Sequence, residues 1–104
     1  MSKFTLDGAL SRLGATDFAR LLEAPGFDLS LYRPDGNDPQ SPHLRDEFYF
    51  IAAGSGTFEE NGVAGSVAPG DVLFVAAGTP HRFRDFTADF AAWVIFIGPR
   101  RGQD

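Results

Sequence analysis

Short apolar segments separated by turn-forming residues run through the chain from position 17 to position 98. The segments are rich in Phe, Val, Ile and Leu, and Gly, Pro, Asn and Asp stand between them. Residues of the first kind favour strands, and those of the second kind favour turns. Many short strands with almost no helix are typical of an antiparallel β-sandwich or barrel. We therefore predict an all-β fold.

Two hairpins have the most definite turn signals. Ala24-Pro25-Gly26 separates residues 18–23 from residues 27–33, where apolar and polar positions alternate as in a half-buried strand. Asn61-Gly62 separates residues 57–60 from residues 63–67, and Asn-Gly is a preferred hairpin turn. Further strands are predicted at residues 42–51, 72–75, 81–85 and 91–97.

One short helix is expected near the N-terminus. Leu6, Leu10 and Leu13 recur at helical spacing, with Thr5 as the N-cap and Gly14 as the stop. A chain of 104 residues is long enough for one core, so we predict a single domain over residues 1–104. Within it we expect an arm at residues 1–16, a barrel at 17–98 and a loose tail at 99–104.

Composition limits the partners. The net charge of -5 and the pI near 4.8 argue against nucleic acid and anionic membranes, because binding to phosphate needs basic patches. The chain has no cysteine, which excludes disulfides, thiolate catalysis and cysteine-bound zinc. Its first residues lack the apolar core of a signal peptide, and no window is apolar enough to span a membrane. We expect a cytoplasmic protein.

The predicted strand at 42–51 carries chemistry that a core strand does not need. Alternate side chains of a strand share a face, and one face here would hold His43, Arg45, Glu47, Tyr49 and Ile51. The second histidine of the chain, His81, opens another predicted strand. Both histidines follow a proline at the end of a loop. Two imidazoles and one carboxylate are the donors of a facial triad for a divalent metal; an empty, hydrogen-bonded polar pocket is the alternative.

The segments 36–54 and 70–85 resemble the two sequence motifs of the cupin superfamily. Matching positions are His43, Glu47 and Gly54 in the first motif and Gly70, Gly78 and His81 in the second, with Asp85 where the motif has Asn. The resemblance implies a small antiparallel jelly-roll barrel with the site inside. It also implies a bound divalent ion (Fe, Mn, Zn or Ni) held by His43, Glu47 and His81.

The chain departs from the cupin motifs at two positions. Ser41 stands where the family has its first histidine ligand, and Ala76 replaces the usual proline of the second motif. A serine hydroxyl is a poor ligand for a divalent metal, although it can hydrogen-bond a water held by the ion. We therefore expect a three-ligand site with weaker binding, and we draw no functional conclusion from Ala76.

Other residues are weaker candidates for the pocket. The phenol of Tyr49 is a candidate catalytic group that would donate to a substrate oxygen, or it is a core aromatic with a satisfied hydroxyl. Arg45 would hold an acidic substrate or form a salt bridge at the barrel mouth, and we favour the salt bridge. Glu47 is a candidate general base if it is not a ligand. Alternation predicts an apolar wall made of Phe83, Trp93 and Ile95, and a solvated charge set made of Arg82, Arg84 and Asp85.

Several predicted strands are apolar on both faces, notably at Phe48, at Phe50 and along residues 72–75 and 93–97. The N-terminal arm can cover part of the outer face, and a second copy can cover the rest, so we predict a homodimer. For function, we expect a metal-dependent enzyme acting on a small molecule, of oxygenase, isomerase or lyase type. The alternatives are a non-catalytic cupin that binds a small ligand and a purely structural one.

Overall fold

The computed structural model describes residues 1–39 and 41–98, and the tail predicted at 99–104 lies outside this part. Helix α1 spans Leu6–Leu13. The strands that follow are β1 (Phe18–Glu23), β2 (Phe27–Tyr32), β3 (Asp46–Ala53), β4 (Gly56–Glu60), β5 (Val63–Val67), β6 (Val72–Val75), β7 (His81–Arg84) and β8 (Ala91–Ile97).

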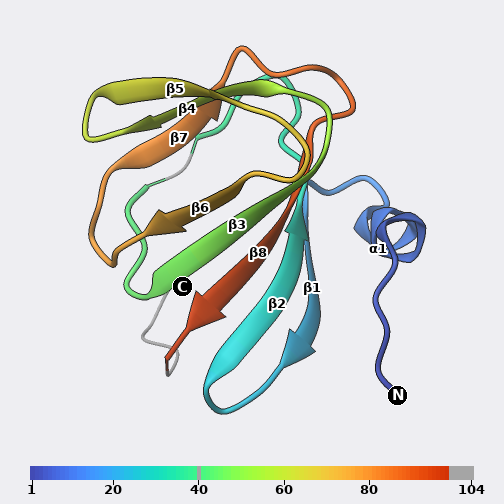
Figure 1. Ribbon diagram of the computed structural model, residues 1–104. Helices are drawn as coiled ribbons and strands as arrows, with labels where there is room; N and C mark the ends of the chain where they lie inside the picture. Colours follow the sequence, from blue (N-terminus) through green and yellow to red (C-terminus); the bar gives the residue numbers. More distant parts are fainter. Residues whose placement is uncertain (40, 99–104) are drawn as a thin grey trace.

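The strands form two antiparallel sheets that face each other (Figure 1). The larger sheet has the order β1-β2-β8-β3-β6, and the smaller one has the order β5-β4-β7. This arrangement confirms the predicted all-β jelly roll. Among the described residues no hydrogen-bonded ladder joins the two sheets, so β5 and β6 are edge strands and the barrel is open between them.

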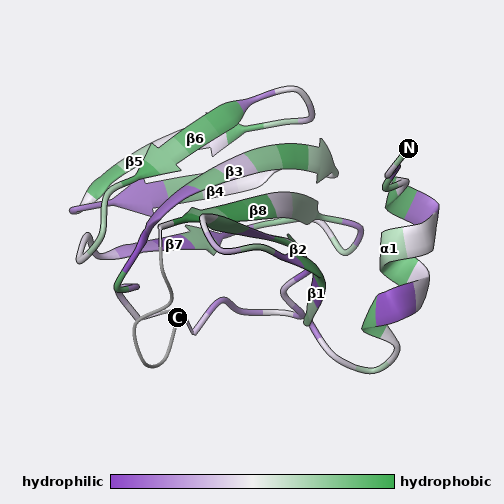
Figure 2. Ribbon diagram, turned by 90° about the horizontal axis from the view of Figure 1, so that it is seen from below, coloured by the Kyte–Doolittle hydropathy of each residue, from purple (hydrophilic) through white to green (hydrophobic). Residues whose placement is uncertain are grey.

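The apolar core has two parts. The larger cluster fills the space between the sheets and includes Tyr49, Phe58, Phe83, Phe90 and Phe96. The smaller cluster lies between α1 and the large sheet, at the side of the molecule where α1 stands apart in Figure 2. It is built from Ala9, Leu13, Ala19, Leu31 and Ala91, with Trp93 packed against it.

Helix α1 has the predicted ends. The hydroxyl of Thr5 accepts a hydrogen bond from the amide of Gly8 at 3.0 Å, and Gly14 closes the helix with a φ of 57°. A helix of this length is too short to cross a bilayer, and no longer apolar helix occurs in the described part of the chain.

Strands β2 and β3 differ from their predicted form. Asp28 and Ser30 on β2 are fully buried and share a face with Tyr32, so this strand is covered on both sides. Strand β3 begins at Asp46, four residues later than predicted. The carbonyl of His43 accepts a hydrogen bond from the amide of Gly78 at 2.8 Å, so His43 is tied to the β6–β7 loop and lies outside the sheet.

Candidate metal centre

The fold brings His43, Glu47 and His81 together from distant parts of the chain. Glu47 lies on β3 in the large sheet, His81 begins β7 in the small sheet, and His43 lies in the connection before β3. One possible ligand atom from each residue lies within 4.8 Å of the others. Glu47 Oε1 is 2.8 Å from His81 Nε2 and 3.8 Å from His43 Nε2. Two imidazoles and a carboxylate thus converge on one point between the sheets.

The backbone sets the proton position on His81. Its Nδ1 lies 2.8 Å from the carbonyl oxygen of Thr79, and a carbonyl can only accept, so Nδ1 carries a hydrogen. In the neutral ring Nε2 then has a free lone pair, and it faces Glu47. A second hydrogen bond of this kind is how proteins orient a metal-binding histidine.

Glu47 is buried without a full set of hydrogen bonds. Its side chain is 0% exposed, and its Oε2 atom receives no hydrogen bond within the described residues. An uncompensated buried carboxylate oxygen is costly, so such an atom calls for a cation or another donor. A divalent ion between Glu47 and the two imidazoles would supply that partner, and nitrogen and oxygen donors suit Fe, Mn, Zn or Ni. The donor set fits a metal.

The pKa of His81 is raised above its ordinary value of 6.5. Burial by itself lowers the pKa, but hydrogen bonds to Glu47 and to the Thr79 carbonyl act the other way. The negative charges of Glu47 and Asp38 add to this effect. Without a metal, the second proton of His81 therefore stays on Nε2 to a higher pH than in a free histidine.

Tyr49 and Phe83 lie beside this centre. The hydroxyl of Tyr49 is 3.1 Å from His81 Nε2, and the residue is almost fully buried. The ring of Phe83 meets the ring of Tyr49 edge to face, with centroids 5.0 Å apart. Phe83 therefore forms part of the inner wall next to the centre, where the sequence pattern placed it.

Arg45 is buried in an ion pair. Its Nη2 lies 2.9 Å from Asp28 Oδ2, and its Nη1 donates to the carbonyl of Gly98 at 3.3 Å. The guanidinium also lies 4.9 Å from the centroid of the Phe96 ring, and the His43 ring lies 5.2 Å from the same ring, measured between centroids. Of the two roles considered for Arg45, the salt bridge is the one seen in the structure.

The predicted wall residues Trp93 and Ile95 do not face the interior. On β8 the residues with inward side chains are Ala92, Val94 and Phe96, which belong to the cluster between the sheets. Trp93 packs instead in the cluster beneath α1, and Ile95 pairs with Phe48 on the outer face. The prediction was wrong because a shift of one residue exchanges the two faces of a strand.

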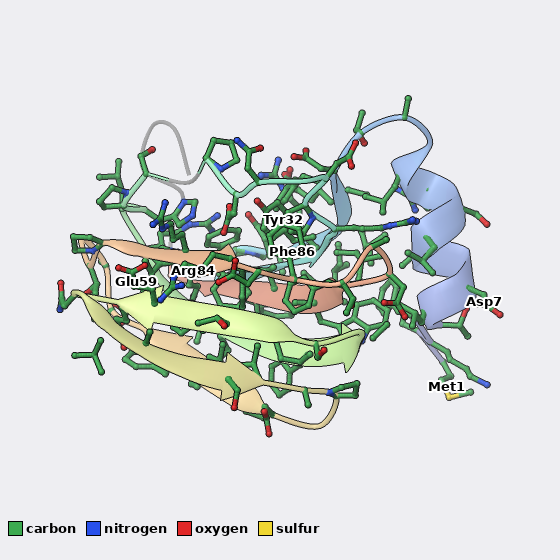
Figure 3. The ribbon with its side chains drawn as sticks, turned by 90° about the horizontal axis from the view of Figure 1, so that it is seen from above. Met1, Asp7, Tyr32, Glu59, Arg84 and Phe86 are labelled. Atoms are coloured by element: carbon green, nitrogen blue, oxygen red, sulfur yellow. The ribbon has the colours of Figure 1, made fainter. Side chains whose placement is uncertain are left out.

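The remaining polar candidates are not among the three residues that converge. Ser41 is exposed. Arg82 and Arg84 point away from the interior and share Glu59 Oε1, at 3.3 and 3.1 Å from their Nε atoms; Figure 3 shows Glu59 and Arg84 side by side. Asp85 pairs with Arg84 at 3.0 Å.

Three residues near the centre were not among the sequence-based candidates. Phe96 separates His43 from Arg45, Asp28 neutralises Arg45, and Asp38 is a buried carboxylate from the β2–β3 connection. The register between β2, β8 and β3 sets two of these positions, since Asp28, Phe96 and Glu47 are paired across the sheet. For Asp28, the sequence did contain a signal, namely an acidic residue in a strand whose apolar positions alternate.

Comparison with known proteins identifies relatives over most of the chain. The family model described as the cupin domain matches residues 29–97. An uncharacterised protein of Streptomyces coelicolor is 33% identical over 103 residues, which cover 95% of this chain and 98% of that protein.

Solved structures agree with this relationship. The cupin 2 conserved barrel domain protein from Salinispora arenicola superposes with a TM-score of 0.71 at 19% identity, covering 93% of this chain and 88% of that one. The DMSP lyase DddQ from Ruegeria pomeroyi gives a TM-score of 0.68 at 30% identity, covering 92% of this chain and 55% of that one. With the family model matching about two thirds of the sequence, this chain belongs to the cupin family.

Proposed function

We propose that this cupin holds one divalent metal ion through His43, Glu47 and His81 and acts with it on a small molecule. The observation that carries the proposal is the buried Glu47 carboxylate, which faces the two imidazoles and lacks a donor at Oε2. A bound metal supplies a Lewis acid that polarises a substrate oxygen. The ion would be Fe, Mn, Zn or Ni.

The chain itself supplies a candidate proton donor and acceptor next to the metal ligands. The Tyr49 hydroxyl lies 3.1 Å from His81 Nε2 in a buried site, where a phenol can give or take a proton at a substrate atom. This placement favours reactions that move a proton, namely isomerisation or elimination, over oxygenation. The DMSP lyase DddQ, which is 30% identical to this chain, is itself named for a lyase-type reaction.

A groove along the open side of the barrel offers a route for a small molecule. It has a volume of about 230 Å³ and lies between β5 and β6, where it is lined by Phe58, Glu60, Val63, Val67 and Leu73, among others. The ring of Phe58 also contacts the rings of His81 and Tyr49, with centroids 6.1 Å away in both cases. Because Glu60 is the one ionisable residue of this lining, the groove favours neutral or cationic ligands over anions.

Metal content tests the proposal first. We expect a stoichiometric ion in protein purified without added metal or reconstituted with Zn²⁺, Mn²⁺, Fe²⁺ or Ni²⁺, and its loss in His43→Ala and His81→Ala. Asp85→Asn, which changes an exposed acid four residues after His81, is the matched control and should keep the ion. A wild-type chain that takes up none of these metals would contradict the proposal and favour a non-catalytic or structural cupin.

Turnover tests the role of Tyr49. The metal-loaded protein is assayed with elimination and isomerisation substrates, including DMSP, and with oxygen consumption as a separate readout. Tyr49→Phe should keep the metal and lose most of the turnover. Turnover equal to that of the wild type would show that Tyr49 takes no part in the reaction. Oxygen consumption by the wild type would favour the oxygenase class.

We also propose that the chain forms a homodimer through the outer face of its large sheet. Phe50, Val72 and Phe74 are all at least one third exposed there, and the ring of Phe48 packs against those of Phe50 and Phe74. A continuous apolar face of this kind is rarely left open to water. The cytoplasmic location expected from the sequence stays a prediction.

A further inference from the structure

Asp38 is a buried acid in a connection that is otherwise mostly exposed. It lies between β2 and β3, its neighbours 35–37 and 39 are exposed, and only 7% of its own surface is accessible. A carboxylate is rarely buried in a loop unless several donors hold it there.

Two donors from different strands hold Asp38. Its Oδ1 accepts a hydrogen bond from the hydroxyl of Tyr32, the last residue of β2. Its Oδ2 accepts one from the backbone amide of Phe83 on β7 at 2.7 Å. Hydrogen bonds to an ionised acceptor are among the stronger ones in proteins. Tyr32 is buried in the apolar cluster between the sheets, so the connection is anchored in the interior.

The hydrogen bonds of Asp38 connect the segment that carries His43 to the strand that carries His81. Phe83 is two residues beyond His81 on the same strand, and His43 is five residues beyond Asp38 in the same connection. A second tie follows between the His43 carbonyl and the Gly78 amide, at 2.8 Å. The ring of His43 then rests 5.4 Å from the ring of His81, measured between centroids.

We propose that Asp38 is a positioning residue: by binding the Phe83 amide and the Tyr32 hydroxyl, it holds the β2–β3 connection on β7 and sets His43 beside His81. The proposal deepens the proposed function, because it explains how a ligand outside the sheet is kept in place. The negative charge of Asp38 near the centre, which also contributes to the raised pKa of His81, adds attraction for a cation.

The test compares Asp38→Ala and Asp38→Asn with Asp35→Asn, an exposed acid in the same connection. In the metal-free protein, the ring protons of His43 and His81 should give a nuclear Overhauser cross-peak in the wild type and in Asp35→Asn. Asp38→Ala should lose this cross-peak while circular dichroism still shows the folded sheet. Its affinity for Zn²⁺, measured by competition with a chelator, should fall by about tenfold or more, as for other residues that orient metal ligands.

A cross-peak and a Zn²⁺ affinity that both stay at wild-type values in folded Asp38→Ala would overturn the proposal. If that variant does not fold, Tyr32→Phe removes the hydrogen bond to Oδ1 and keeps the one from the Phe83 amide, so it should give a weaker cross-peak and an intermediate affinity. Unchanged values would again overturn the proposal. The cross-peak needs no metal. A wild type that shows it but binds none of Zn²⁺, Mn²⁺, Fe²⁺ and Ni²⁺ would therefore contradict the proposed function alone, and loss of the peak in Asp38→Ala would still support the positioning role.

Discussion

His81 Nε2 lies 2.8 Å from Glu47 Oε1, while the opposite nitrogen of the same ring donates to the carbonyl of Thr79. With a second proton on Nε2 the pair is an ion pair, and without that proton the lone pair of Nε2 is free for a metal. Proton and metal therefore compete for one atom in a buried site.

Metal affinity should rise with pH over a range set by His81. Because the pKa of His81 lies above 6.5, the affinity should still be increasing at pH values where an ordinary histidine is already neutral. Zn²⁺ or Co²⁺ titrations at a series of pH values would measure this. An affinity that levels off below pH 6.5 would contradict the role of His81 as a ligand that first loses a proton.

The second proton of His81 also stabilises the fold of the metal-free protein. This stabilisation decreases as the pH rises, whereas the metal affinity increases. A group whose pKa is raised by folding stabilises the protein fully below its unfolded value, here 6.5, and this contribution disappears as the pH rises through the folded value. The difference in free energy of unfolding between the wild type and His81→Gln should therefore shrink with rising pH. Urea unfolding at a series of pH values, in the presence of a chelator, would test whether this difference decreases.

The buried pair of Arg45 and Asp28 should matter for stability more than any surface pair. Their side chains are 2% and 1% exposed, and removing one partner of a buried pair typically costs about 3 kcal/mol or more. We expect Arg45→Met to cost this much. Arg82→Met, which breaks the exposed contact with Glu59, should cost less than about 1 kcal/mol. Equal losses in urea unfolding would contradict the structural role assigned to Arg45.

Much of the fold could be predicted because its signals are local. The Thr5 cap, the Asn61-Gly62 turn and the Pro25-Gly26 turn each depend on neighbouring residues only, and the helix and hairpins lie where these signals place them. The start of β3 could not be predicted in this way. It depends on the hydrogen bond between His43 and Gly78, which are 35 positions apart in the sequence.

The same distinction between local and long-range signals applies to the predictions for the site. The spacing of His43 and Glu47 and their resemblance to a motif were sufficient to select the three residues that converge. The orientation of Trp93, by contrast, depends on which neighbour it meets across β8, and the partner of Arg45 lies on a strand 17 positions earlier. Such contacts are set by sheet register, which a single sequence does not encode locally.

Gly54 should not tolerate a side chain. Its φ is +72°, a conformation that favours glycine, and an added Cβ would lie 2.7 and 2.8 Å from the Cα and N atoms of Phe90. Backbone atoms cannot move aside as a flexible side chain can, so Gly54→Ala should be strongly destabilising. Gly62→Ala, which has a similar φ of +81° but open space around it, is the control and should cost less. Thermal unfolding would rank the two variants.

The outer face of the large sheet should determine the oligomeric state. Phe74 is 50% exposed on β6 and packs against Phe48, with ring centroids 5.1 Å apart, so a charge at this position would lie within the proposed dimer interface. Sedimentation velocity at micromolar concentration should show a dimer for the wild type and a folded monomer for Phe74→Glu. Val63→Glu, at an exposed position on the opposite sheet, should remain a dimer, because it places the same charge outside the interface. A monomeric wild type, or a dimer that survives Phe74→Glu but not Val63→Glu, would show that this face is not the interface.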